Sequence, residues 1–128
     1  MIKIGKLLKD DSVYVGDHPF YTNCFLLCKA QDEPKLMKWQ EAFNYHSDSG
    51  ELPTRQESNT LYQHRKQIGG FLEGYLTTYD YWYSVEDTKF TAWKQCFLSG
   101  KHSIDNKDQT CHVRLVRTVT PEQLEVLV

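Results

Sequence analysis

The sequence predicts an α+β domain in which two helices pack on an antiparallel sheet. Segments in which apolar and polar residues alternate lie toward both ends of the chain, and segments with helical spacing lie between them. A helix-start motif, Thr54 followed by Glu57 three residues later, stands in the middle of the sequence. Strands and helices that are segregated along a chain in this way are typical of α+β folds with an antiparallel sheet.

Three strands are expected in the first part of the chain. They are residues 2–8, which alternate loosely, residues 12–16, which end at a glycine, and residues 19–30, which are rich in aromatic and aliphatic side chains. The continuous apolar run within 19–30 predicts a strand that is buried on both faces.

The first expected helix covers residues 33–47. Leu36, Trp39, Phe43 and His46 recur there at helical spacing. Asp32 or Glu33 can cap its start, and Gly50 is placed to end it.

The second expected helix covers residues 55–67. In the predicted capping box the Thr54 hydroxyl accepts the amide proton of residue 57, while the Glu57 carboxylate accepts the amide proton of Thr54. Leu61 should face the core, and Gly69 with Gly70 should end the helix.

The alternating pattern returns after the second helix. In the strand expected at 90–98, Ala92 and Cys96 share one face, and Trp93 and Phe97 share the other. Residues 99–110 should form a turn and a polar loop, and residues 119–128 a tail or short helix that begins at Thr120. The strands expected in this part of the chain are 79–86, 90–98 and 111–119.

Size and composition indicate one domain, residues 1–128, with its own core. The net charge of −2 argues against nucleic acid as the main partner. The sequence contains neither the long apolar run of a membrane span nor the pattern of a secretory signal. We therefore expect no membrane partner and a location in the cytoplasm.

The four cysteines are expected to be reduced. Cys24 and Cys28 would lie about 13 Å apart on a strand, beyond the reach of a disulfide. Cys96 and Cys111 could face each other on neighbouring strands, although we do not expect a bridge there.

Five short motifs occur in a characteristic order. They are MKWQEAF, ELPTRQE, YWYS, AW with a phenylalanine four residues on and a glycine after it, and VRLVR. Together they resemble the DUF1566 (Lcl C-terminal-like) family, in the short form that phages and prophages carry. The resemblance covers residues 36–117. It implies a C-type-lectin-like fold related to that of formylglycine-generating enzymes.

The resemblance also implies architectural roles for several large side chains. Trp39, Trp82 and Trp93 would fill the core, and Arg114 and Arg117 would tie strands to loops through forked hydrogen bonds. The chain departs from the family at Tyr83, where serine is usual, and in an extended tail after Thr118.

Motifs for catalysis or for cofactor binding are not found in the sequence. The five histidines make no zinc-binding pattern, and the oxygen ligands that calcium needs cannot be assembled. The surroundings of Cys96 and Cys111 do not match the reactive pair of formylglycine-generating enzymes. We therefore expect a protein that is not an enzyme and that holds no metal or cofactor.

The loops at 70–80 and 99–110 are the expected contact surfaces, although their aromatic side chains could instead pack on neighbouring loops. The favoured hypothesis is a phage or prophage accessory protein that binds a host protein in the bacterial cytoplasm, and inhibits a host enzyme or defence system. The alternative is a module of the virion that binds a glycan or receptor. The candidate contact residues are Tyr75, Tyr79, Tyr83, Lys101 and His102.

Overall fold

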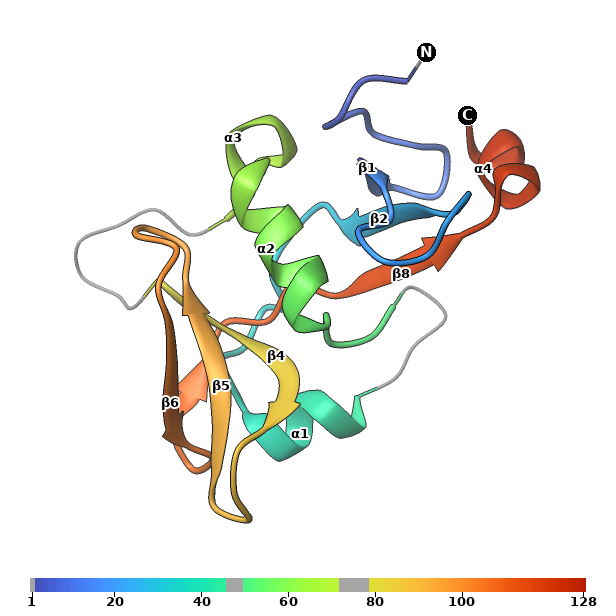
Figure 1. Ribbon diagram of the computed structural model, residues 1–128. Coiled ribbons are helices and arrows are strands. Elements are labelled where there is room, and N and C mark those ends of the chain that lie inside the picture. The colour runs from blue at the N-terminus through green and yellow to red at the C-terminus, as the bar shows by residue number, and fades with distance from the viewer. Residues whose placement is uncertain (1, 46–49, 72–78) are drawn as a thin grey trace.

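The computed structural model describes residues 2–45, 50–71 and 79–128 (Figure 1). Over these residues the chain is a mixed α+β fold with antiparallel pairing in its sheets, as the sequence predicts. The described residues form four helices and three sheets, where two main helices and one sheet were expected. The strands are β1 (Ser12–Asp17), β2 (Phe25–Lys29), β3 (Met37–Lys38), β4 (Asp80–Glu86), β5 (Thr91–Cys96), β6 (His102–Asn106), β7 (Thr110–Cys111) and β8 (Val116–Val119). The helices are α1 (Trp39–Asn44), α2 (Arg55–Gln63), α3 (Arg65–Ile68) and α4 (Pro121–Leu127).

The first sheet joins the two ends of the chain. Its order is β1-β2-β8, and both neighbours of β2 run antiparallel to it. Leu27 of β2 stands opposite Tyr14 of β1 and Arg117 of β8. Since β2 is the central strand, its side chains at 26–28 are buried on both faces, as expected from the apolar run.

The second sheet has the order β4-β5-β6. Gln95 of β5 stands opposite Tyr81 of β4 and His102 of β6. On one face Lys94 forms ion pairs with Asp80 and Asp105, and so links all three strands.

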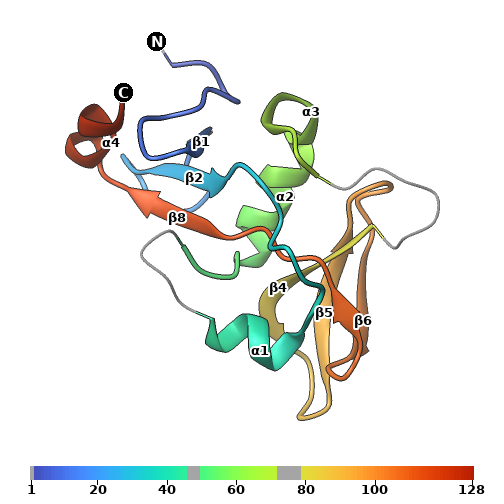
Figure 2. The same ribbon diagram turned by 180° about the vertical axis from the view of Figure 1, so that it is seen from behind.

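Helix α2 runs between the two sheets (Figures 1 and 2). Its capping box is confirmed, since the Thr54 hydroxyl accepts from the Glu57 amide at 3.2 Å and Glu57 accepts from the Thr54 amide at 2.8 Å. The single helix expected over 55–67 is interrupted at His64, and the short α3 continues to Ile68. Gly69, with a φ of 75°, then ends the helical segment.

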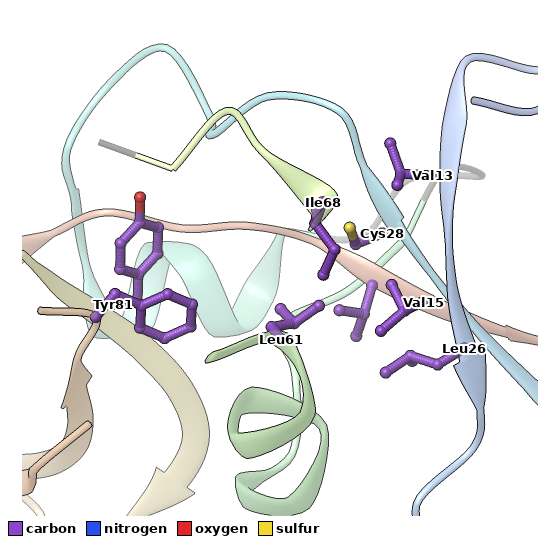
Figure 3. Close-up of a cluster of buried hydrophobic side chains, with 9 residues drawn as sticks. Val13, Val15, Leu26, Cys28, Leu61, Ile68 and Tyr81 are labelled. Carbon is purple, nitrogen blue, oxygen red and sulfur yellow. The ribbon is translucent and has the colours of Figure 1, made fainter. Parts of the chain in front are cut away.

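The main apolar core lies between α2 and the two sheets (Figure 3). Leu61 projects from α2 toward β1 and β2, which confirms its expected place in the core. Tyr81 closes the cluster from β4. A second cluster lies between α1 and the β4-β5-β6 sheet, and a third lies under α4.

Several predicted boundaries were wrong at the N-terminal end. Residues 2–8 form turns with one isolated bridge, from Leu7 to Val13, because Gly5 and Lys6 bond to the outer edge of β1 without a regular ladder. The strand expected over 19–30 begins at Phe25. The residues before it form a turn around the buried His18 side chain.

The predicted start of the helix expected over 33–47 was also wrong. Met37 and Lys38 pair with β7, so α1 begins at Trp39, and Leu36 and Phe43 are exposed. The expected positions of His46 and of residue 47 lie outside the described residues.

The C-terminal part of the chain, after β5, contains a strand that the sequence analysis missed. Residues 102–106, expected as a polar loop, form β6 at the edge of the second sheet. The strand expected over 111–119 is split into β7 and β8, because β7 pairs with β3 in a separate two-stranded sheet, whereas β8 pairs with β2 in the first sheet. The helix expected after Thr120 is present as α4, with the predicted cap. Within the described residues, no helix has the length and apolar character needed to cross a membrane.

Candidate binding surface

Arg55 is the first residue of α2, so the capping box at Thr54 decides where its side chain leaves the helix. Its Nη1 atom donates a hydrogen bond to the Tyr83 hydroxyl at 3.0 Å. Its Cζ atom lies 5.2 Å from the centroid of the Trp93 ring. The exposed guanidinium is therefore held by a hydrogen bond and by an aromatic face.

A buried polar network beneath this guanidinium joins α2 to β5. The carbonyl of Gly100 can only accept a hydrogen bond, so the Gln95 atom 3.1 Å from it is the amide nitrogen. The same nitrogen donates to Asn59 Oδ1 at 3.0 Å. The Gln95 oxygen accepts from the Ser58 hydroxyl at 2.7 Å. Each amide in the network therefore has one orientation.

The hydrogen positions in the rest of the network follow from Asn59. Its Oδ1 atom accepts, so His102 Nε2, at 2.8 Å, carries the proton. His102 Nδ1 is then the acceptor, and the Tyr83 hydroxyl donates to it at 2.9 Å. The Tyr83 oxygen in turn accepts from Arg55. All these bonds are satisfied by a neutral imidazole.

The electrostatics of the network agree with this assignment. Burial, together with the nearby Arg55 charge, lowers the pKa of His102. Burial raises the pKa of the Tyr83 hydroxyl, against the opposing effect of Arg55. At neutral pH the histidine is therefore uncharged and the tyrosine keeps its proton.

The surface extends from Trp93 on β5 to Ile104 on β6. These two residues stand directly opposite each other, and Ile104 is 43% exposed. We call Arg55, Trp93 and Ile104 the Arg55 surface. Among the described residues, no carboxylate forms an ion pair with the Arg55 guanidinium.

The five predicted contact residues have different places in the structure. Tyr83 is buried, so the expectation that it contacts a partner directly was wrong, but it meets His102 in the network. Lys101 is exposed just before β6, and Tyr79 is half-buried beside β5. Tyr75 lies outside the described residues.

The predicted roles of the tryptophans hold for two of the three. Trp39 and Trp82 are buried, and their indole N–H groups donate to the carbonyls of Tyr83 and Met37 at 2.9 and 2.8 Å. Trp93 is only partly buried, because Arg55, rather than a core residue, covers its ring.

Arg114 makes the forked bonds that were expected of it. Its Nε donates to Asp32 at 3.0 Å, and its Nη1 donates to the carbonyls of Lys29 and Gly69 at 3.0 and 3.2 Å. Arg117 joins β8 to the turn before β1 through an ion pair with Asp10 at 2.5 Å.

The sequence analysis missed a second buried pair, His18 with Glu57. His18 Nε2 lies 2.7 Å from Glu57 Oε2, and His18 Nδ1 accepts from the amides of Phe20 and Tyr21. No local pattern marks the pair, because the two residues are 39 positions apart and His18 lies in a turn. It anchors a turn from which Phe20 and Tyr21 project into solvent.

All four cysteines are free thiols, in agreement with the sequence analysis. Burial raises the pKa of Cys28 to about 11 and that of Cys111 to about 12. Cys96 is less buried. Burial acts to raise the pKa of its thiol, but hydrogen bonds from Ser99 and the Leu98 amide together lower it. In the described part of the chain, no three histidine, cysteine or acidic side chains gather as metal ligands.

The fold and this surface together define an α+β domain with a rigid basic and aromatic patch beside a sheet edge. A scan against models of known protein families finds no family that matches the chain. A search of curated proteins likewise finds no match.

Proposed function

We propose that this protein is a binding module without catalytic activity, and that the Arg55 surface holds a protein partner. The observation that carries the proposal is the stacking of Arg55 on Trp93, with its Nη1 bonded to Tyr83. Arginine and tryptophan are the side chains that most often dominate protein interfaces. A guanidinium that is already oriented loses little conformational entropy when a partner binds.

The bonding of the two histidines in these networks, His18 and His102, supports a role without catalysis. His18 bonds to Glu57 and to two backbone amides, so both of its ring nitrogens are engaged. Both ring nitrogens of His102 are also engaged, by Tyr83 and Asn59. A general acid or base needs a nitrogen that can reach a substrate.

We extend the proposal to the family of the protein and to its role in a phage. The ordered motifs suggest a C-type-lectin-like DUF1566 protein that a phage or prophage carries as an accessory factor against a host protein. The motif residues Thr54, Trp82 and Arg114 support this idea, since each holds elements of the fold together.

Affinity capture tests the proposal. Tagged protein is incubated with bacterial lysate, and retained proteins are quantified by mass spectrometry beside the variants Arg55→Glu and Trp93→Ala. Val126→Ser is the matched control, because Val126 is 73% exposed and belongs to α4, which lies on the opposite side of the molecule from β6 in Figure 1. We expect a partner whose retention falls at least about tenfold in both surface variants and is unchanged in the control.

Equal retention by all four proteins would contradict the proposed surface. A glycan array separates the alternative function. Specific glycan binding that survives removal of the Arg55 charge would favour a receptor-binding module instead.

A further inference from the structure

Over the residues that the structure describes, strand β6 has backbone groups that no neighbouring strand pairs, beside the Arg55 surface. The Cys96 amide donates to the Lys101 carbonyl, and the Lys107 amide donates to the Phe90 carbonyl. Hydrogen-bonded and non-bonded pairs alternate along an antiparallel ladder. Gln95 with His102, and Trp93 with Ile104, are therefore non-bonded pairs. The N–H and C=O groups of His102 and Ile104 consequently point away from β5.

This edge is open over a short length. β6 is the outer strand of its sheet, and no backbone partner for His102 or Ile104 is found among the described residues. Toward the end of the strand the edge closes, since the Asn106 carbonyl accepts from Gln109 and its amide bonds to Asp105. The open part thus offers two donors and two acceptors to a short extended segment.

The side chain of His102 makes the edge rigid. Its two ring nitrogens tie β6 to Tyr83 of β4 and to Asn59 of α2. The backbone groups on the other side are therefore held in place before any partner arrives, which lowers the entropic cost of binding.

The charge of the surface selects the occupant. Arg55 bears a guanidinium without a carboxylate partner in the described part of the chain, and it lies over Trp93 of the central strand β5. Ile104 of β6, which stands opposite Trp93, lies between this position and the open edge, so a long side chain of an added strand would reach Arg55 across Ile104. A second copy of this protein, paired through β6 about a two-fold axis, would bring a second Arg55 guanidinium, a like charge, to that face. An acidic segment would pair with it through charge-assisted hydrogen bonds.

We propose that an extended, acidic segment of a partner protein adds to β6 as a fourth strand. Its main chain bonds to His102 and Ile104, an apolar side chain covers Trp93 and Ile104, and a carboxylate binds Arg55. This mode of recognition takes affinity from the backbone and specificity from alternate side chains. The inference rests on the proposed function and names the chemistry of the partner.

The test uses the full chain and a displayed library of random peptides of about ten residues, which is enough to cover an edge of this length. We expect enriched peptides to carry an acidic residue flanked by β-branched or aromatic residues. Dissociation constants of the best peptide, measured by fluorescence anisotropy, should rise at least about tenfold for Arg55→Glu. Exchange of the acidic peptide residue for lysine should restore binding to that variant alone.

Two further probes test the backbone contribution. Ile104→Pro removes an N–H that faces outward, a position where an edge strand tolerates proline, and should abolish peptide binding. If this variant fails to unfold cooperatively in urea, peptides methylated at alternate amide nitrogens replace it. Methylation of one alternating set should abolish binding, and methylation of the other set should leave it intact. Val126→Ser should bind as the original protein does.

Several outcomes would overturn the inference. The inference fails if the library yields no enriched peptides, or if the peptides bind to the Arg55 and Ile104 variants as tightly as to the original protein. It also fails if methylation of either set of amide nitrogens leaves binding intact. A dimer that sedimentation detects, and that Ile104→Pro separates into monomers, would show a second copy of the protein at this edge instead. A host protein could also be captured in a way that depends on Trp93, while the best peptide fails to displace it. That result would overturn the strand-addition inference, but the proposed binding function would stand.

Discussion

Arg114 shows how much one side chain can hold together in this fold. Its buried guanidinium contacts Asp32, the end of β2 and the end of α3, and it lies 4.0 Å from the centroid of the Phe71 ring. These segments are distant in sequence, so the bonds of Arg114 fix their relative positions. Arg117, three residues further along the chain and within β8, makes a more exposed ion pair with Asp10.

Replacement of Arg114 by lysine should therefore be costly although the charge is kept. Lysine cannot form the fork or lie flat on Phe71. We expect Arg114→Lys to lower the free energy of unfolding in urea by about 3 kcal/mol. The matched change Arg117→Lys should cost less than about 1 kcal/mol. Similar values for the two variants would contradict the structural role of Arg114.

The tryptophans should differ in the same measurement. Trp82 is wholly buried between α1 and the second sheet, so Trp82→Ala should cost about 3–5 kcal/mol. Trp93 is partly exposed, and its ring is covered by the Arg55 side chain rather than by core residues. Trp93→Ala should therefore cost less than about 2 kcal/mol. A loss as large as that of Trp82 would place Trp93 among the core residues.

At the scale of elements, the two capped helices have different settings. The Thr54 cap starts α2, which lies between the sheets, and the Thr120 cap starts α4, which covers the first sheet at the end of the chain. Both hydroxyls accept an amide proton at 3.2 Å. The geometry of the caps is the same, so their contribution to folding depends on the helix that each one serves.

Thr54→Ala should lower the unfolding free energy by about 1 kcal/mol, and Thr54→Ser should restore most of it. Thr120→Ala should have a smaller effect on global unfolding, since a terminal helix can fray while the rest stays folded. Hydrogen exchange would show that fraying as faster exchange confined to α4. Equal global losses for both alanine variants would show that α4 unfolds only with the whole domain.

At the scale of the whole molecule, α2 joins two sheets by different means. Leu61 packs into the apolar cluster with the first sheet, while Ser58 and Asn59 bond to the network of the second. The attachment to β6 passes through neutral His102, and protonation of its Nδ1 would remove the acceptor for the Tyr83 hydroxyl. The joint between α2 and the second sheet should therefore depend on pH.

The pKa of His102 is lowered in the folded protein, so the unfolded chain binds a proton more readily. This contribution to stability is complete above the unfolded pKa of about 6.5 and is lost as the pH falls through the folded pKa. We expect the difference in unfolding free energy between the original protein and His102→Gln, measured by urea unfolding, to shrink as the pH falls from about 8 to about 5. The lowered pKa values of Asp10 and Asp105 act below that range. A constant difference between the two proteins would contradict this coupling.

The sequence by itself determined the elements whose signals are local. The Thr54 and Thr120 caps, the alternation in 12–16, 79–86 and 90–98, and the apolar face of α2 at Leu61 all depend on residues a few positions apart. Local patterns of this kind report the period and the ends of an element directly. The α+β class followed from their order along the chain.

Only the tertiary structure decided which elements met and which side chains remained exposed. β6 has little apolar pattern and exists because it pairs with β5, and α1 starts late because Met37 and Lys38 pair with β7. The Arg55 surface and the polar network beneath it need residues from α2, β4, β5 and β6, which no spacing in the sequence connects. Contacts between distant residues depend on how the sheets and α2 pack, and that packing has no period to be read in the chain.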